Sequence, residues 1–293
     1  MKKFRVVINI FILVLIMNFP AQTVEQVNNK RLDNDRDMLK DISPIFNTEI
    51  RLLKDPGKYL TFEHDKKKDR NLGLNYRLAH LKTNNNGYAT VRLILLVNNK
   101  DEIAMFKISI DTDNEAAWNI LSGEFNYSSQ KNAVVSRFGL NCITMVEKGY
   151  SKFESDFAAY LGKPNTVRIP AKIQEEYELL RNPLNDLVYG AICSAGAVKP
   201  HGRVAIEKIM KYGNVKVIEN ILRSANPEGR IYAIQALFAK NVKSLKSKNR
   251  YSDTIDRILK LGIPVNTCFG CTFDYEEINA EKLYNHVSSS LSL

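Results

Sequence analysis

A repeated segment between Pro200 and Pro264 constrains the fold of this chain more than any other feature of the sequence. Its two copies open with matching residues, which are Pro200, Gly202, Arg203 and Val204 in the first and Pro227, Gly229, Arg230 and Ile231 in the second. Each opening is followed by two runs whose apolar residues have the spacing of one helix face. The segment therefore predicts two consecutive helix pairs, the second lengthened by an insertion between Phe238 and Thr254.

Residues that end and begin helices lie between the expected elements. Gly213 can adopt a positive φ just past the first helix, and Asn214 can accept a hydrogen bond at the start of the next. Asn226, Pro227 and Glu228 are residue types preferred at the N-cap and the first two helical positions, where a carboxylate also suits the helix dipole. Short connections between the helices are therefore expected.

Short antiparallel helix pairs with an arginine and a small residue in the first helix resemble HEAT-like repeats, and the resemblance covers residues 200–264. It implies a third pair upstream of Pro200, because one pair cannot bury its apolar face alone. It also implies an extended concave surface that binds a protein partner. Arg203 and Arg230 are the candidate residues of that repeat surface. They either bond backbone carbonyls of the neighbouring repeat or face a ligand.

The N-terminus has the pattern of a secretory signal peptide, which we expect over residues 1–23. Basic residues precede an apolar run from Val6 to Met17, and this run is shorter than the ~20 residues that cross a bilayer. An uncleaved N-terminal anchor is the alternative. No second long apolar segment follows, so the protein is expected to be secreted or periplasmic, without a transmembrane span after signal removal. Residues 24–36 are polar and are expected to form a flexible leader.

Alternating apolar residues predict a β-hairpin in the region 37–163. Every second residue from Ala89 to Val97 is apolar, a turn is expected at Asn98–Asp101, and a second strand returns from Ile103 to Ile110. Because the centre of this hairpin is apolar on both faces, helices are expected to cover each side. Candidate helices cover residues 115–121 and 151–161, and a linker is expected at Gly162–Asn165.

The expected fold class is therefore α+β. A small N-terminal region at 37–163, with a β-hairpin packed by helices, is followed by an all-α antiparallel helix-pair (HEAT-like) region at 164–287. Residues 288–293 are expected to be a disordered tail. A hydrophobic content of 44% in 293 residues is enough for a sizeable core.

Four cysteines are present, and an even number in an exported chain favours disulfides. They are Cys142, Cys193, Cys268 and Cys271, for which three pairings are possible. A structural role is either a local Cys268–Cys271 bridge or two longer bridges that include Cys142 and Cys193. The Cys-x-x-Cys spacing also admits thiol–disulfide exchange or half of a zinc site. The acidic residues that follow would raise a thiol pKa and so oppose activation.

The insertion before the last helix is a candidate anion-binding surface. It carries Lys240, Lys243, Lys246, Lys248 and Arg250 without one acidic residue. In a chain with a formal net charge of +10, such a run can bind lipid headgroups or an acidic protein. Nucleic acid is not expected, because the protein is exported and aromatic residues are nearly absent from the run. A solvated loop is the alternative.

Motifs of the common enzyme classes are absent from the sequence. The chain has no nucleophile elbow, no phosphate-binding glycine loop and no dinucleotide fingerprint, and its four histidines lack metal-ligand spacing. No catalytic residue, metal ligand or cofactor is therefore predicted. We expect a non-enzymatic interaction or scaffold protein that presents a helical-repeat surface to a protein partner. The alternatives are an envelope enzyme, either a thiol oxidoreductase or a hydrolase with a site within residues 40–160, and a polyanion-binding surface protein.

Overall fold

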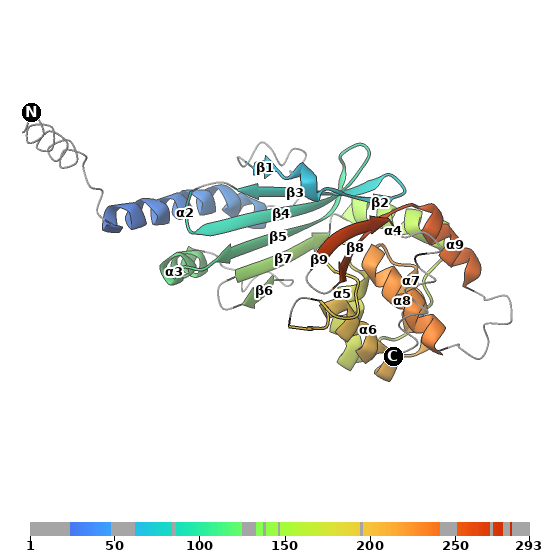
Figure 1. Ribbon diagram of the computed structural model, residues 1–293. Coiled ribbons are helices and arrows are strands. Elements are labelled where there is room, and N and C mark those ends of the chain that lie inside the picture. Colours follow the sequence, from blue (N-terminus) through green and yellow to red (C-terminus); the bar gives the residue numbers. More distant parts are fainter. Residues whose placement is uncertain are drawn as a thin grey trace, which may run out of the picture.

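The computed structural model describes residues 24–47, 62–83, 86–124, 133–136, 139–145, 147–193, 196–240, 251–269, 272–277 and 282. An antiparallel sheet carries helices on both faces, and further helices gather at one end of it (Figure 1). This arrangement confirms the α+β fold class. The expected signal peptide, the tail at 288–293 and most of the basic insertion lie outside the described residues.

Seven strands of the described part of the chain form the main sheet, in the order β1-β3-β4-β5-β7-β6, and β2 also pairs with β3. Their bounds are β1 (Phe62–His64), β2 (Arg70–Gly73), β3 (Tyr76–Thr83), β4 (Ala89–Asn98), β5 (Ile103–Thr112), β6 (Ala133–Ser136) and β7 (Gly139–Met145). A short 3-10 turn, η3 (Lys66–Lys68), precedes β2. The expected hairpin is confirmed as β4 and β5, in which Val91 lies opposite Ile110 and Leu95 opposite Phe106.

One face of this sheet is covered by α2 (Val24–Asn47) and α3 (Glu115–Glu124). Alternate residues of β4 and β5 form a core there with Met38 of α2, and Trp118 and Ile120 of α3 pack against it. The helix α2 includes residues 24–36, so the expected flexible leader is wrong. The reason lies in the buried carboxylate of Asp35, which accepts hydrogen bonds from the backbone N–H groups of Tyr88 and Ala89. These bonds tie the helix to the start of β4.

The other face packs against the second half of the chain. Leu78, Leu96 and Met105 belong to a core that continues through α4 (Glu147–Leu161), the 3-10 turn η5 (Ala171–Ile173) and α5 (Gln174–Arg181) into the C-terminal helices. The core therefore crosses the expected linker at Gly162–Asn165 without a break. The two regions separated in the sequence share one hydrophobic interior.

The repeated segment forms the four expected helices, α6 (His201–Tyr212), α7 (Val215–Leu222), α8 (Pro227–Lys240) and α9 (Ser252–Lys260). The two expected N-caps are present, because Asn214 Oδ1 accepts from Val217 N and Asn226 Oδ1 accepts from Gly229 N. The positive φ expected at Gly213 is wrong, since this residue ends α6 with φ −93°. The helix α8 is buried along residues 227–237, since α5, α6, α7 and a following strand pack around it. The HEAT-like resemblance itself stays a prediction.

Residues 264–269 and 272–277, which follow α9, form strands, and this corrects the expected all-α region. β8 (Pro264–Phe269) and β9 (Thr272–Glu277) form a two-stranded antiparallel sheet. Proline is tolerated at the first residue of a strand, and the residues that follow it include β-branched Val265 and Thr267. Tyr189 extends this sheet, because its N–H donates to Asn266 O and its carbonyl accepts from Cys268 N. The strand β8 is thus anchored by a segment far away in the sequence.

Among the described residues, no helix combines the length and the apolar character that a membrane span requires.

The repeated glycines allow close helix contacts, and we predict a measurable cost for removing one. A Cβ added at Gly229 of α8 would lie 1.8 Å from the carbonyl oxygen of Leu180, the penultimate residue of α5. Glycine to alanine normally stabilises a helix interior by about 1 kcal/mol. Here we expect Gly229→Ala to lower the free energy of unfolding by about 1–3 kcal/mol in urea titration, because the helices must move apart. Lys216→Ala, at an exposed position of α7, should change it by less than ~0.5 kcal/mol. Equal stability of the two variants would contradict the close contact.

Candidate functional site

In both repeated arginines, Arg203 and Arg230, the Nε–H group donates a hydrogen bond to a backbone carbonyl. For Arg203 the acceptor is Gly190 O at 3.2 Å, and the centre of the Tyr232 ring lies 5.2 Å from the guanidinium carbon. This contact ties α6 to the segment that precedes it. Of the two roles expected for these arginines, bonding a backbone carbonyl or facing a ligand, this contact is of the first kind.

Arg230 is enclosed more completely, with 1% of its surface exposed. Its Nε donates to Ser224 O at 2.6 Å, and its guanidinium carbon lies 5.2 Å from the centre of the Phe157 ring. Burial lowers the pKa of Arg230 to about 9, although Glu228 acts in the opposite sense, so the group is charged at neutral pH. Arg230 therefore fastens the turn between α7 and α8 to α4 and presents no charge to solvent.

The disulfide joins Cys193 to Cys268, with a Cα–Cα distance of 5.6 Å. The predicted alternative of a local Cys268–Cys271 bridge is therefore wrong, because Cys268 pairs with Cys193. Cys142 lies in β7, opposite Ile108 of β5, and Cys271 falls outside the described residues. The sulfur of Cys268 is bonded and its residue is 2% exposed, which does not suit a nucleophile that must reach a substrate. The bridge instead links the loop before α6 to β8.

Of the basic residues in the insertion, the structure describes Lys240 at the end of α8, where it is exposed. Lys243, Lys246, Lys248 and Arg250 lie outside the described residues. Anion binding by this run stays a prediction.

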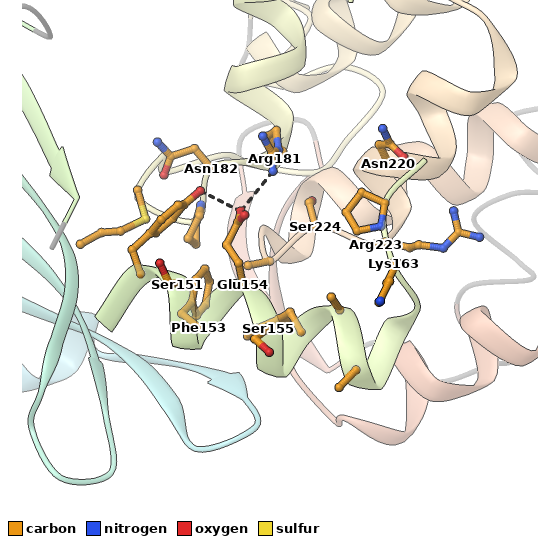
Figure 2. A pocket seen from close by; sticks show the side chains of 18 of the residues that line it. Ser151, Phe153, Glu154, Ser155, Lys163, Arg181, Asn182, Asn220, Arg223 and Ser224 are labelled. Carbon is orange, nitrogen blue, oxygen red and sulfur yellow. Dashed lines mark hydrogen bonds and ion pairs between the residues drawn. The ribbon is translucent and has the colours of Figure 1, made fainter. Parts of the chain in front are cut away.

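A cavity of about 600 Å³ lies between α4, α5 and the turn from α7 to α8 (Figure 2). We call it the α4 groove, because the residues of α4 that line it run from Tyr150 to Ala159 and form its long wall. At a rise of 1.5 Å per residue this wall is about 14 Å long. The other lining residues are Met105, Lys163, Pro164, Glu178, Arg181, Asn182, Pro183, Asn220, Arg223, Ser224 and Ala225. The volume lies within the range of ~300–1,000 Å³ common for ligand sites.

One end of the α4 groove gathers two carboxylates around one guanidinium. Glu154 Oε1 accepts hydrogen bonds from Tyr150 Oη at 2.7 Å and from Arg181 Nη2 at 3.3 Å (Figure 2). Arg181 Nη1 also lies 3.7 Å from Glu178 Oε1. Burial and then the bond to Glu154 raise the pKa of Tyr150, so its hydroxyl stays a donor at neutral pH. Two carboxylates against one cation leave this end with a net charge of −1.

The opposite end is basic. Lys163 lies two residues after the end of α4, is exposed, and forms no ion pair with any residue that the structure describes. Arg223 Nη1 lies 3.6 Å from Glu219 Oε2. Gly162 has φ +97°, and a Cβ there would lie 3.3 Å from Arg223 Nε, so this glycine serves both the turn and the position of the guanidinium. Two cations against one carboxylate leave this end with a net charge of +1.

The segment Gly162–Asn165 at this basic end, expected to be a linker, is hydrogen-bonded to α7. Asn165 N donates to Asn220 Oδ1 at 2.6 Å, and Asn220 Nδ2 donates back to Asn165 O at 3.0 Å. Asn165 Nδ2 also donates to Glu219 Oε2, and Glu219 Oε1 accepts from Tyr251 Oη. This network fixes Lys163 and Pro164 as part of the groove wall.

The chemistry of the α4 groove suits recognition. Its two carboxylates bind the same guanidinium, whereas an acid and base pair for hydrolysis faces a substrate across a gap. Over the residues described, no group of three or more His, Cys, Asp or Glu side chains is arranged to hold a metal ion. Aromatic and apolar side chains, including Phe153 and Phe157, lie beside the charged ones. This mixture is typical of a surface that orients a ligand through a few polar contacts.

The sequence predicted some elements that line the α4 groove but did not predict that they lie together. The helix at 151–161 and the turn at Gly162–Asn165 were expected, and both form groove walls. Nothing local indicated that Arg181 and Arg223 would meet them, because these residues come from α5 and from the end of α7. Comparison of the chain with protein-family models, with curated proteins and with solved structures finds no match.

Proposed function

We propose that this protein is an exported, non-enzymatic interaction protein that binds a short extended peptide segment of a partner in the α4 groove. The observation that carries the proposal is that the lining residues extend along one helix, from Tyr150 to Ala159 of α4 (Figure 2). A wall about 14 Å long matches about four residues of extended chain, at roughly 3.3–3.6 Å each.

The lining supports a peptide occupant. The accessible apolar lining at Ala158, Ala159 and Pro164, which lies over the buried side chains of Met105, Phe153 and Phe157, can contact side chains of a peptide, and the polar rim can bond a backbone. The rim includes Ser151, Ser155 and Asn182. Such a combination of apolar floor and polar rim resembles small interfaces in general, where buried aromatic contacts supply most of the affinity.

Export is supported by the Cys193–Cys268 disulfide, since such bonds persist in oxidising compartments. The expected binding surface on the repeat helices is less well supported, because the face of α8 is buried along residues 227–237. The α4 groove, in contrast, is open to solvent, because side chains of its wall such as Glu154 and Ser155 are exposed. We therefore place the binding site in the α4 groove and keep the class of function that the sequence predicts.

A cavity-filling substitution tests this proposal. Ala158 lines the groove, and Ala158→Phe should fill it with little effect on the hydrophobic core, because the side chain is only partly buried. We expect peptides enriched on the wild-type protein from a displayed random hexapeptide library to bind this variant at least tenfold more weakly. Binding is measured by fluorescence polarisation with the enriched peptides. Circular dichroism and urea titration check that the variant is folded.

The matched control is Ala116→Phe, the same change at an exposed position of α3. This variant should bind the peptides as the wild-type protein does. Peptides that bind both variants equally, or a library that yields no peptide dependent on the groove, would overturn the proposal.

A further inference from the structure

The two ends of the α4 groove differ in charge. Glu154 and Glu178 share Arg181 at one end, whereas Lys163 and Arg223 face the single carboxylate of Glu219 at the other. Besides its ion pair with Arg223 Nη1, that carboxylate accepts hydrogen bonds from Asn165 Nδ2 and Tyr251 Oη, so its negative charge is shared among several donors. The cation of Lys163 is therefore the least compensated charge in the groove.

We infer that the peptide segment bound in the α4 groove carries an acidic side chain, which pairs with Lys163, and that the segment is oriented by this contact. The inference rests on the proposed function, because it names the chemistry of the ligand for the same groove. A carboxylate at the basic end gains two nearby cations, Lys163 and Arg223. A basic side chain there would meet the same cations and be excluded by repulsion.

The acidic end of the groove fixes the direction of the segment. An acidic residue placed beside Glu154 and Glu178 would face two carboxylates with one shared guanidinium, so the reversed orientation is disfavoured. Without residues 1–23, which carry Lys2, Lys3 and Arg5, the chain keeps a formal net charge of +7 (10 minus 3), which also favours approach of an acidic partner. Local and overall charge therefore select the same class of ligand.

The test compares three labelled hexapeptide pools that differ in one fixed residue, which is Asp, Asn or Lys. Wild-type protein at low salt should bind the Asp pool at least fivefold more tightly than the Lys pool, with the Asn pool between them. Lys163→Glu should remove or reverse this order, because the basic end then becomes acidic. The matched control is Lys30→Glu, the same charge change at an exposed position of α2, far from the groove (Figure 1). This control should keep the wild-type order.

Each outcome bears on one of the two ideas. Equal binding of the Asp and Lys pools, or an unchanged order in Lys163→Glu, would overturn the inferred acidic ligand and leave the groove as a peptide site, provided that Ala158→Phe still blocks binding. Failure of all pools to bind in a groove-dependent way would overturn the proposed function as well. Complete displacement of the Asp pool by millimolar inorganic phosphate would show a small-anion site and overturn the peptide ligand.

Discussion

Replacing Arg70 with methionine should lower the free energy of unfolding by about 3–5 kcal/mol, the usual effect of breaking a buried ion pair from one side. Arg70 Nη2 lies 2.6 Å from Glu228 Oε1, and the two side chains are 4% and 0% exposed. The pair joins β2 of the main sheet to the first turn of α8. It therefore fastens the sheet to the helical region at a point where neither charge can reach water.

The surroundings explain why the loss should be large. Glu228 Oε1 also accepts from Asn266 N at 2.8 Å, and Arg70 Nη2 lies 3.3 Å from Pro264 O, so the pair holds β8 too. Burial raises the pKa of Glu228, while Arg70 acts in the opposite sense. Without Arg70 the buried carboxylate must either stay charged without its counter-ion or take up a proton, and both raise the free energy of the folded state.

Urea titration of three variants separates this explanation from a general loss of packing. Arg92→Met breaks the ion pair between Arg92 and Asp111, in which the two side chains are 55% and 46% exposed. This change should lower the free energy of unfolding by less than about 1 kcal/mol. The double variant Arg70→Met with Glu228→Leu should recover much of the loss, because it leaves no unpaired buried charge. A cost for Arg70→Met no larger than that for Arg92→Met would contradict the role of the buried pair.

Removing the disulfide should cost a similar amount, about 4 kcal/mol for the double variant Cys193→Ser with Cys268→Ser. The two cysteines are 75 positions apart, so the bridge closes a long loop that contains α6, α7, α8 and α9. In the chain-entropy account, a bridge of this span removes much of the freedom of the unfolded chain. The variant and the wild-type protein are compared by urea titration under oxidising conditions.

Wild-type protein in a reducing agent supplies the matched control for the disulfide. It should unfold at the same urea concentration as the double serine variant, because both lack the same bond. Peptide mass mapping without reduction should recover a fragment that contains both Cys193 and Cys268. Equal stability of the oxidised wild-type protein and the serine variant would contradict a stabilising bridge.

Local patterns in the sequence determined several elements of this protein. The alternation from Ala89 to Val97 specified β4 and its partner, because apolar side chains on one face of a strand must be buried together. The caps at Asn214 and Asn226 specified the starts of α7 and α8, since each side chain bonds an N–H within three residues of itself. Interactions of this range can be recognised from neighbouring residues alone.

Contacts between distant segments decided the rest. Asp35 holds α2 in place through the N–H groups of Tyr88 and Ala89, and Tyr189 anchors β8, so neither the first half of α2 nor β8 could be recognised from its own sequence. The choice of Cys193 as the partner of Cys268 depended on the same tertiary contacts. The α4 groove likewise joins side chains from four separate parts of the chain. Only the burial of a shared core brings such residues together, and a linear sequence does not record which distant surfaces will meet.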